Sequence, residues 1–130
     1  MGIFDKVFGN SKKEPKEVRV LPWKHLTTRA QLDEITKTSK SKPVAIFKHS
    51  TTCGISRMVL RGLEADYDIE ASQLDFYYLD LKAYRDVSNE IAARFQVWHE
   101  SPQMILVKNG TAVYNASHGS VNVHGLKAKL

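Results

Sequence analysis

The chain has 130 residues, 42% of them hydrophobic and 25% charged, and this size and composition suit one soluble domain with one core. No run of about 18 apolar residues is present to span a membrane, and the N-terminus has no signal-peptide core, so we expect a cytoplasmic protein without a membrane partner. The net charge of +5 comes from basic residues spread along the chain with no nucleic-acid motif, so we expect no nucleic-acid partner.

The N-terminal segment differs in composition from the rest of the chain. Residues 9–16 are polar and include a glycine, an asparagine and a proline, which interrupt regular structure. We therefore predict a flexible N-terminal arm over residues 1–17, followed by one domain over residues 18–130.

The domain reads as strands and helices in alternation. In chain order we predict a strand at 18–21, a helix from Thr27 or Thr28 to about Ser39, a strand at 44–47, a helix from Cys53, a strand at 74–81, a helix capped by Asp86 or Ser88, strands at 104–107 and 111–114, and a last helix capped by Ser120. The helix after Cys53 is expected to bury a stripe of Ile55, Met58, Val59 and Leu63. Asn109-Gly110 is typical of a tight hairpin turn.

This order of elements predicts an α/β fold. The first three strands are separated by helices, so right-handed crossovers place them parallel in one sheet. The last two strands are joined by the short turn and must run antiparallel. We expect a mixed sheet of about five strands with helices on both faces.

Cys53 is the only cysteine, which excludes an internal disulfide and an all-cysteine metal site. It follows a predicted buried strand and opens a predicted helix. The start of a helix presents unpaired N–H groups and about half a positive charge, which stabilise a thiolate over a thiol. Because the thiolate is the attacking species in disulfide exchange, the position of Cys53 predicts a redox-active thiol.

Polar residues close to Cys53 are candidates to assist it. Ser56 lies three residues further on, and its hydroxyl can reach back to the sulfur. A hydroxyl cannot attack a mixed disulfide, so the pair forms a one-thiol version of a Cys-x-x-Cys site. Lys48, His49 and Arg57 add positive charge, and we treat Lys48 and His49 as candidate modulators of the thiol.

A second candidate element is the segment Glu100-Ser101-Pro102, directly before a predicted strand. A proline at this point, after a helix and before a sheet strand, is a candidate for a cis peptide bond. The topology places it beside Cys53. Ser101 would then offer its backbone N–H and C=O to an extended substrate chain.

These two elements together carry a family resemblance. The topology, the cysteine position and Ser101-Pro102 resemble thioredoxin and glutaredoxin. The segments FKHSTTCGISRM (residues 47–58) and WHESPQ (residues 98–103) resemble the monothiol bacilliredoxin family of the bacillithiol system, over roughly residues 20–130. The resemblance implies a thioredoxin fold and a bacterial, cytoplasmic, monomeric enzyme. It further implies that the enzyme removes bacillithiol from mixed disulfides with client proteins.

The resemblance also implies roles for individual residues. Cys53 and Ser56 would be catalytic, no cofactor would be bound, and bacillithiol would serve as thiol co-substrate. The implied substrate-binding residues are Thr52, Gly54, Arg57, Ser101 and Pro102. Bacillithiol carries a malate group, whose carboxylates would be held by one of the cations Lys48, Arg57, Arg61 and Lys24. Gly54 departs from the family, which has proline after the cysteine, and should make the loop less rigid.

Two other functions remain open from the sequence. Cys53-Gly54-Ile55-Ser56 differs at one position from the Cys-Gly-Phe-Ser of monothiol glutaredoxins, which share an iron–sulfur cluster between two subunits. Against such a carrier, residues 115–119 lack the Gly-Gly and acidic pair that bind glutathione there. The other alternative is a non-catalytic adaptor of the same fold, in which a basic face binds a partner and Cys53 is incidental.

Overall fold

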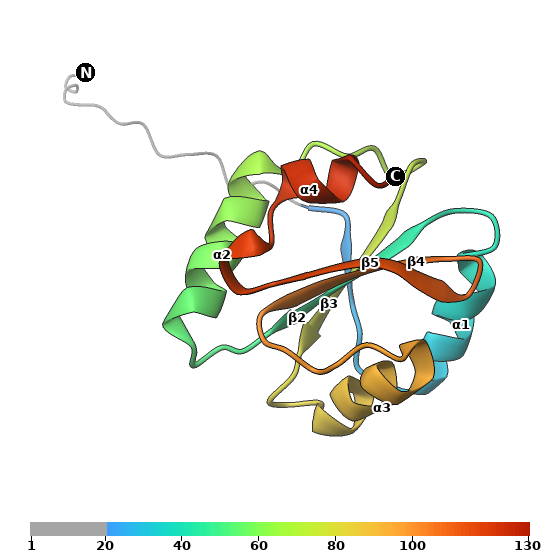
Figure 1. Cartoon of the computed structure of the whole chain (residues 1–130), viewed down its shortest axis with the longest axis horizontal. Coiled ribbons are helices and arrows are strands. Elements are labelled where there is room, and N and C mark those ends of the chain that lie inside the picture. Colours follow the sequence, from blue (N-terminus) through green and yellow to red (C-terminus); the bar gives the residue numbers. More distant parts are fainter. Residues whose placement is uncertain (1–20) are drawn as a thin grey trace, which may run out of the picture.

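A five-stranded sheet forms the centre of the protein, for which a computed structural model describes residues 21–130 (Figure 1). The strands are β1 (Trp23–His25), β2 (Val44–His49), β3 (Asp75–Asp80), β4 (Gln103–Lys108) and β5 (Thr111–Ser117). Their order across the sheet is β1-β3-β2-β4-β5. The first three are parallel and the last two antiparallel, which confirms the predicted mixed α/β sheet.

Helices cover both faces of this sheet, as expected (Figure 1). They are α1 (Ala30–Thr38), α2 (Gly54–Asp66), α3 (Arg85–Phe95) and α4 (Val123–Lys127), with a short 3-10 turn, η1 (His118–Ser120), before the last. The buried residues form two clusters, one on each face of the sheet. Helices α1 and α3 supply the first cluster, and α2 and α4 supply the second.

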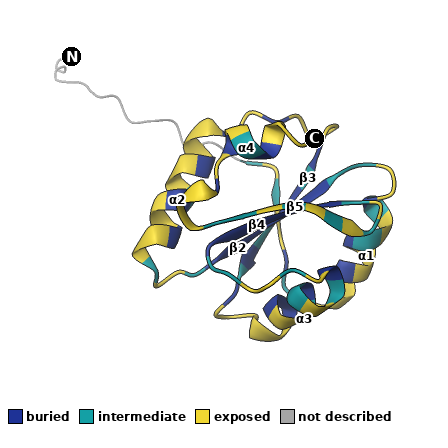
Figure 2. Cartoon of the chain, viewed as in Figure 1, coloured by how far each residue is buried: buried dark blue, intermediate teal, exposed yellow. Residues whose placement is uncertain are grey.

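The alternation of side chains along β2 separates these two clusters. Val44 and Ile46 belong to the core under α1 and α3, whereas Ala45 and Phe47 belong to the core under α2 and α4. All four are fully buried, as the dark central strands of Figure 2 show. A continuous apolar run is therefore needed at this position, because both faces of β2 are covered.

The turn that joins β4 and β5 is the one the sequence predicts. Asn109 and Gly110 both have positive φ, at 52° and 75°, as a type I′ hairpin turn requires. Asparagine and glycine tolerate this conformation best, which is why this dipeptide is a reliable signal.

Several predicted boundaries were wrong. The predicted arm and residues 18–20 of the strand predicted at 18–21 lie outside the described residues and are not tested; the first described strand is Trp23–His25. Helix α3 begins after Tyr84, not after Asp86 or Ser88, because Asp80 already accepts the N–H groups of the preceding turn. Helix α4 is capped by Asn122, whose side chain accepts the Gly125 N–H at 2.7 Å, instead of by Ser120.

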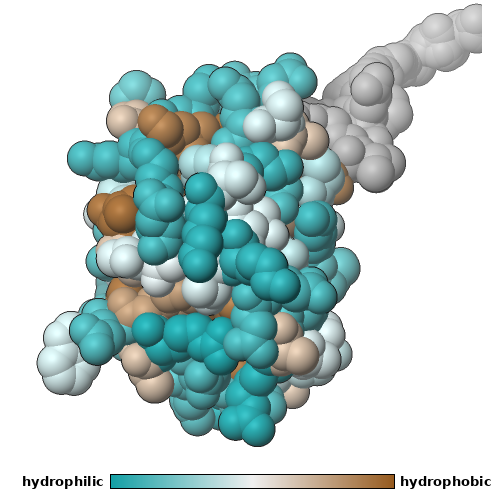
Figure 3. Space-filling view, turned by 90° about the vertical axis from the view of Figure 1, so that its right-hand side faces the viewer, coloured by the Kyte–Doolittle hydropathy of each residue, from teal (hydrophilic) through white to brown (hydrophobic). Residues whose placement is uncertain are grey.

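Polar side chains dominate one face of the molecule. Figure 3 shows the face at the right of Figure 1, where apolar side chains occur only as small separate patches among hydrophilic ones. Within residues 21–130, no helix has both the length and the apolar character needed to cross a bilayer.

The strand directions bring three loops to one edge of the sheet. Strands β2 and β3 are parallel and end side by side, with His49 opposite Asp80. Strand β4 runs the other way and starts at this edge, with Gln103 opposite Lys48. The loops at residues 50–53, 81–84 and 98–102 therefore meet where the chain leaves β2 and enters α2.

Candidate active site

Cys53 stands between the end of β2 and the first turn of α2. Its backbone is extended, at φ −100° and ψ 124°, and it is the N-cap residue of the helix. Its N–H donates to the Ser50 carbonyl at 3.2 Å, and its own carbonyl accepts the first helical hydrogen bond, from the Arg57 N–H at 3.0 Å. The thiol is free and partly exposed, as a reacting sulfur at a helix N-terminus must be.

Ser56 does not contact the sulfur in the way the sequence suggested. Its hydroxyl is fully buried, accepts the Ser50 N–H at 3.0 Å and lies 2.8 Å from Nδ1 of His49. The first turn of α2 directs this side chain inward, onto the end of β2. Ser56 therefore acts on Cys53 only indirectly, because it holds the backbone of the loop that leads to the cysteine.

His49 is the last residue of β2, which extends two residues beyond the strand predicted at 44–47. It is buried beneath α2, with its ring 5.6 Å from the ring of Tyr78 and 5.9 Å from that of Phe47. Burial lowers the pKa of its imidazole below the usual 6.5, although the Asp80 carboxylate opposes this. His49 is therefore neutral at neutral pH and adds no positive charge beside the thiol.

Lys48 points to the opposite face of the sheet and is completely buried. Within the described residues its ammonium nitrogen has no hydrogen-bond partner. Burial lowers the pKa of this ammonium to about 8, while Glu100 acts to raise it and Arg85 to lower it. The pKa of His99, in the neighbouring loop, is also lowered, first by burial of its imidazole and then by the positive charge of Lys48. Lys48 is thus a buried cation under the loop before β4.

The peptide bond between Ser101 and Pro102 is cis, as predicted. The loop that contains it is held by Gln103, the first residue of β4 and itself buried. The Gln103 side chain donates to the Trp98 carbonyl at 2.9 Å and accepts the Glu100 N–H at 3.3 Å. This role of Gln103 was not predicted from the sequence, because a glutamine at the start of a strand resembles an ordinary surface residue.

The backbone of Ser101 remains available for a ligand. Within residues 21–130, neither its N–H nor its C=O takes part in a hydrogen bond. Its hydroxyl is buried and also unpartnered there. Pro102 is already anchored, because its carbonyl accepts the His118 N–H at 2.9 Å. Ser101 can therefore accept an extended chain in the manner of an added strand.

Two cations lie along the loop before Cys53. Arg57 donates from Nη1 to the Thr51 carbonyl at 3.4 Å, and Lys82 donates from Nζ to Oγ1 of Thr52 at 3.3 Å. Arg57 was expected here, whereas Lys82 was missed. Lys82 reaches this edge because β2 and β3 pair in parallel and end side by side. The sequence alone does not show which strands pair, so this position of Lys82 could not be predicted.

The other cations proposed from the sequence are placed less favourably. Lys24 forms an ion pair with Asp75 at 3.4 Å, and Asp75 is the first residue of β3, at the opposite end of the sheet from Cys53. Arg61 is exposed on α2, two turns beyond the cysteine. Lys48 is buried. Among these candidates only Arg57 contacts the cysteine loop.

Three large apolar side chains are exposed on the elements that flank Cys53. Ile55 and Met58 of α2 are 48% and 59% exposed, so the prediction that they belong to the buried stripe was wrong. Val59 and Leu63 do belong to it. Trp98, in the loop before the cis-proline, is 90% exposed. These side chains can contact a protein substrate without any rearrangement of the core.

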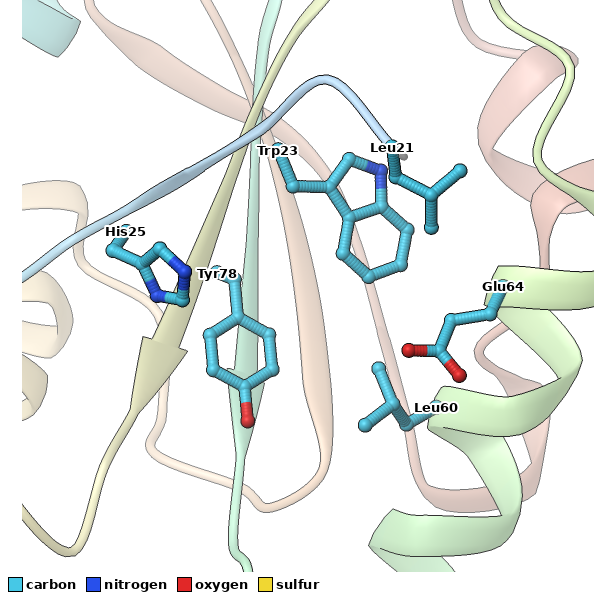
Figure 4. Close-up of a pocket in the computed structure, with 6 residues that line it drawn as sticks. All are labelled: Leu21, Trp23, His25, Leu60, Glu64 and Tyr78. Atoms are coloured by element: carbon cyan, nitrogen blue, oxygen red, sulfur yellow. The ribbon is translucent and has the colours of Figure 1, made fainter. Parts of the chain in front are cut away.

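A surface cavity of about 350 Å³ lies between the edge of the sheet and α2. Figure 4 shows Trp23 and Tyr78 of the sheet facing Leu60 and Glu64 of α2 across it. Tyr78 is also the ring that packs on His49. The cavity therefore adjoins the buried residues that support the cysteine loop, without containing Cys53 among its lining residues.

No metal centre is visible among these groups. In the part of the chain that the structure describes, no cluster of three or more histidine, cysteine, aspartate or glutamate side chains has a geometry suited to a metal ion. The chemistry that the described residues offer is that of a single thiol at a helix N-terminus, beside a loop with free backbone groups.

Comparison with known proteins agrees with this arrangement. The family model described as monothiol bacilliredoxin BrxC matches residues 24–126. Among solved structures, the chain is similar to a candidate oxidoreductase with a thioredoxin fold, at 32% identity and a TM-score of 0.67, over 82% of this chain and 92% of that one.

Thioredoxins of two organisms are more distant matches. The Fasciola hepatica protein is 22% identical with a TM-score of 0.62, over 82% of this chain and 94% of its own. The Malassezia sympodialis protein is 19% identical with a TM-score of 0.66, over 90% and 95%. At these identities the two structures establish the thioredoxin fold alone.

Proposed function

This chain belongs to the monothiol bacilliredoxin family, and on that premise we propose that it removes bacillithiol from mixed disulfides with client proteins through Cys53. The observation that carries the proposal is the position of the sulfur. Cys53 is partly exposed at the N-terminus of α2, at the sheet edge where the Ser101–Pro102 loop also lies. The sulfur is accessible there, and a client chain can reach it.

The proposed step is one thiol–disulfide exchange. The Cys53 thiolate attacks the bacillithiol sulfur of the mixed disulfide, and a new disulfide forms between Cys53 and bacillithiol. The bond between the client sulfur and bacillithiol breaks, and the client leaves as a thiolate that takes a proton from water. Oxidation of Cys53 balances reduction of the client, so no further reductant is needed in this step.

A second small thiol completes the cycle. Cys53 is the only cysteine, and Ser56 cannot attack a disulfide, so the bacillithiol on Cys53 must leave through an external thiolate. That thiolate attacks the bacillithiol sulfur and releases Cys53 as a thiolate, with a small-molecule disulfide as the other product. We place this cycle in the cytoplasm, where thiols are kept reduced.

The client would bind along the loop that precedes β4. The free N–H and C=O of Ser101 can pair with an extended client segment, while the exposed Trp98 of the same loop offers apolar contact. Such backbone pairing recognises many sequences, which suits an enzyme that must act on diverse client proteins.

The proposal is tested with a client peptide that carries bacillithiol on its one cysteine. We expect the protein to release the free peptide thiol well above the uncatalysed rate, as followed by reversed-phase chromatography. The Cys53→Ser variant, which keeps the fold and loses the sulfur, should give the uncatalysed rate.

Two results would contradict the proposal. Equal release by the wild type and Cys53→Ser would remove the sulfur from the reaction. A visible absorbance band in the purified protein, together with no exchange, would favour the iron–sulfur carrier instead.

A further inference from the structure

Two cations flank the active cysteine without a carboxylate to neutralise them. Arg57 and Lys82 come from different elements, the first turn of α2 and the loop after β3. The ion pairs found within residues 21–130 use other basic residues. Arg57 and Lys82 instead contact only neutral oxygens, a carbonyl and a hydroxyl.

Their positions relative to the sulfur follow from these contacts. Lys82 binds the side chain of Thr52, the residue before Cys53. The Arg57 guanidinium lies over the residue after it, because a Cβ built on Gly54 would be 4.0 Å from Nη2. Both cations therefore lie within two residues of Cys53 along the chain, Lys82 at Thr52 and Arg57 between Thr51 and Gly54.

The acidic groups at this edge of the sheet form no ion pair with Arg57 or Lys82 within the described residues. The Asp80 carboxylate accepts the backbone N–H groups of Lys82 and Ala83, at 3.2 and 3.3 Å. Glu100 lies 3.3 Å from the imidazole of His118. Within the described residues Arg57 and Lys82 are thus not paired with a carboxylate, and Arg57 keeps further N–H donors for a ligand.

We propose that Arg57 and Lys82 form the carboxylate-binding site for the small thiol that exchanges with Cys53. This inference rests on the proposed function and names the chemistry of its small partner, a thiol that carries two carboxylates. A planar guanidinium binds one carboxylate through two parallel hydrogen bonds, and an ammonium binds another as a compact charge. The site selects anionic over neutral thiols, and its residues position the ligand without taking part in the bond exchange.

The test compares two disulfides of one peptide, the first with mercaptosuccinate, which carries two carboxylates, and the second with uncharged 2-mercaptoethanol. We expect wild-type protein to exchange faster with the mercaptosuccinate disulfide. Arg57→Gln and Lys82→Gln should each slow that reaction by about two- to fivefold, the range expected for partly exposed charge pairs. The rate with the uncharged disulfide should fall less, so that the preference for the mercaptosuccinate disulfide shrinks in both variants.

Matched controls remove the same charge elsewhere. Arg29→Gln and Lys40→Gln alter exposed cations at the start of α1 and just beyond its end, against the other face of the sheet. Both controls should react like the wild type with both disulfides.

The outcomes separate this inference from the function on which it rests. A wild type that exchanges with neither disulfide contradicts the proposed function. A wild type that exchanges with both at equal rates, or variants that slow both reactions equally, contradicts the carboxylate site and leaves the exchange activity intact.

Discussion

Single side chains around Cys53 divide into those that support its loop and those that are open to ligands. Ser56 and His49 belong to the first group, since both are buried and bonded to each other. Arg57 and Lys82 belong to the second, since both are exposed and hydrogen-bonded only to neutral groups. Loss of a supporting residue should therefore affect stability first, and loss of an open one should affect the choice of substrate.

Ser56→Ala tests the supporting role. The substitution leaves the Ser50 N–H and Nδ1 of His49 without their partner, and buried unpaired groups of this kind cost about 1–3 kcal/mol. We expect the free energy of unfolding to fall by that amount, as measured by urea denaturation. The rate of Cys53 alkylation at neutral pH should change by less than about twofold, because no hydrogen bond joins the hydroxyl to the sulfur.

Ser88→Ala is the matched control for this change. Ser88 is equally buried in α3, but its hydroxyl has no partner within the described residues. Its removal should be neutral or slightly stabilising. If Ser56→Ala behaved like Ser88→Ala in urea but slowed alkylation strongly, a direct contact with the sulfur would be indicated instead.

Lys48→Met tests the buried cation through pH. The pKa of Lys48 is about 8 in the folded protein, against 10.5 for an ordinary lysine, so folding disfavours its charged form. Below pH 8 Lys48 is protonated in both the folded and the unfolded state, so the full free-energy cost of burying its charge is present. Between pH 8 and 10.5 the unfolded chain binds more protons, so stability rises with pH.

Methionine removes this cost without a large change in volume. We expect Lys48→Met to be more stable than the wild type by roughly 1–3 kcal/mol at pH 7, and the difference to shrink by pH 9.5. Urea denaturation at the two pH values measures both numbers. A variant that is less stable at pH 7, or a difference independent of pH, would show that the ammonium has a stabilising partner.

Helices and strands differed in how well the sequence predicted them. The buried strands β2 and β4 and the hairpin turn were predicted because their signals are local: apolar runs covered on both faces, and two residues suited to positive φ. The starts of α3 and α4 were not, since several polar residues compete to cap a helix and only the tertiary path of the chain selects one.

The stripe of α2 shows the same limit. Its spacing is apolar from Ile55 to Leu63, yet Ile55 and Met58 are exposed. The buried face of the helix instead follows the spacing of Ser56, Val59 and Leu63. The inward position of that turn is taken by Ser56. Periodicity predicted the helix and its buried end correctly, but it cannot distinguish a core residue from one exposed at a binding surface.

The molecule as a whole brings the site together by its sheet topology. Parallel β2 and β3 end at the edge where antiparallel β4 begins, so three loops distant in sequence lie beside one thiol. Cys53 and Ser101-Pro102 were predictable because each has a local signature. Lys82 and Gln103 were not, because their contribution depends on this pairing of strands.

The central claim is that Cys53 itself takes up the small thiol while the client leaves reduced. Intact-mass measurement after mixing the protein with one equivalent of a bacillithiolated client protein tests it most directly. The account predicts that the mass of one bacillithiol moves from the client to this protein, on the peptide that contains Cys53. A covalent complex of the two proteins as the stable product would contradict the account. So would the absence of any transfer of bacillithiol to a protein whose Cys53 had been shown to be reduced.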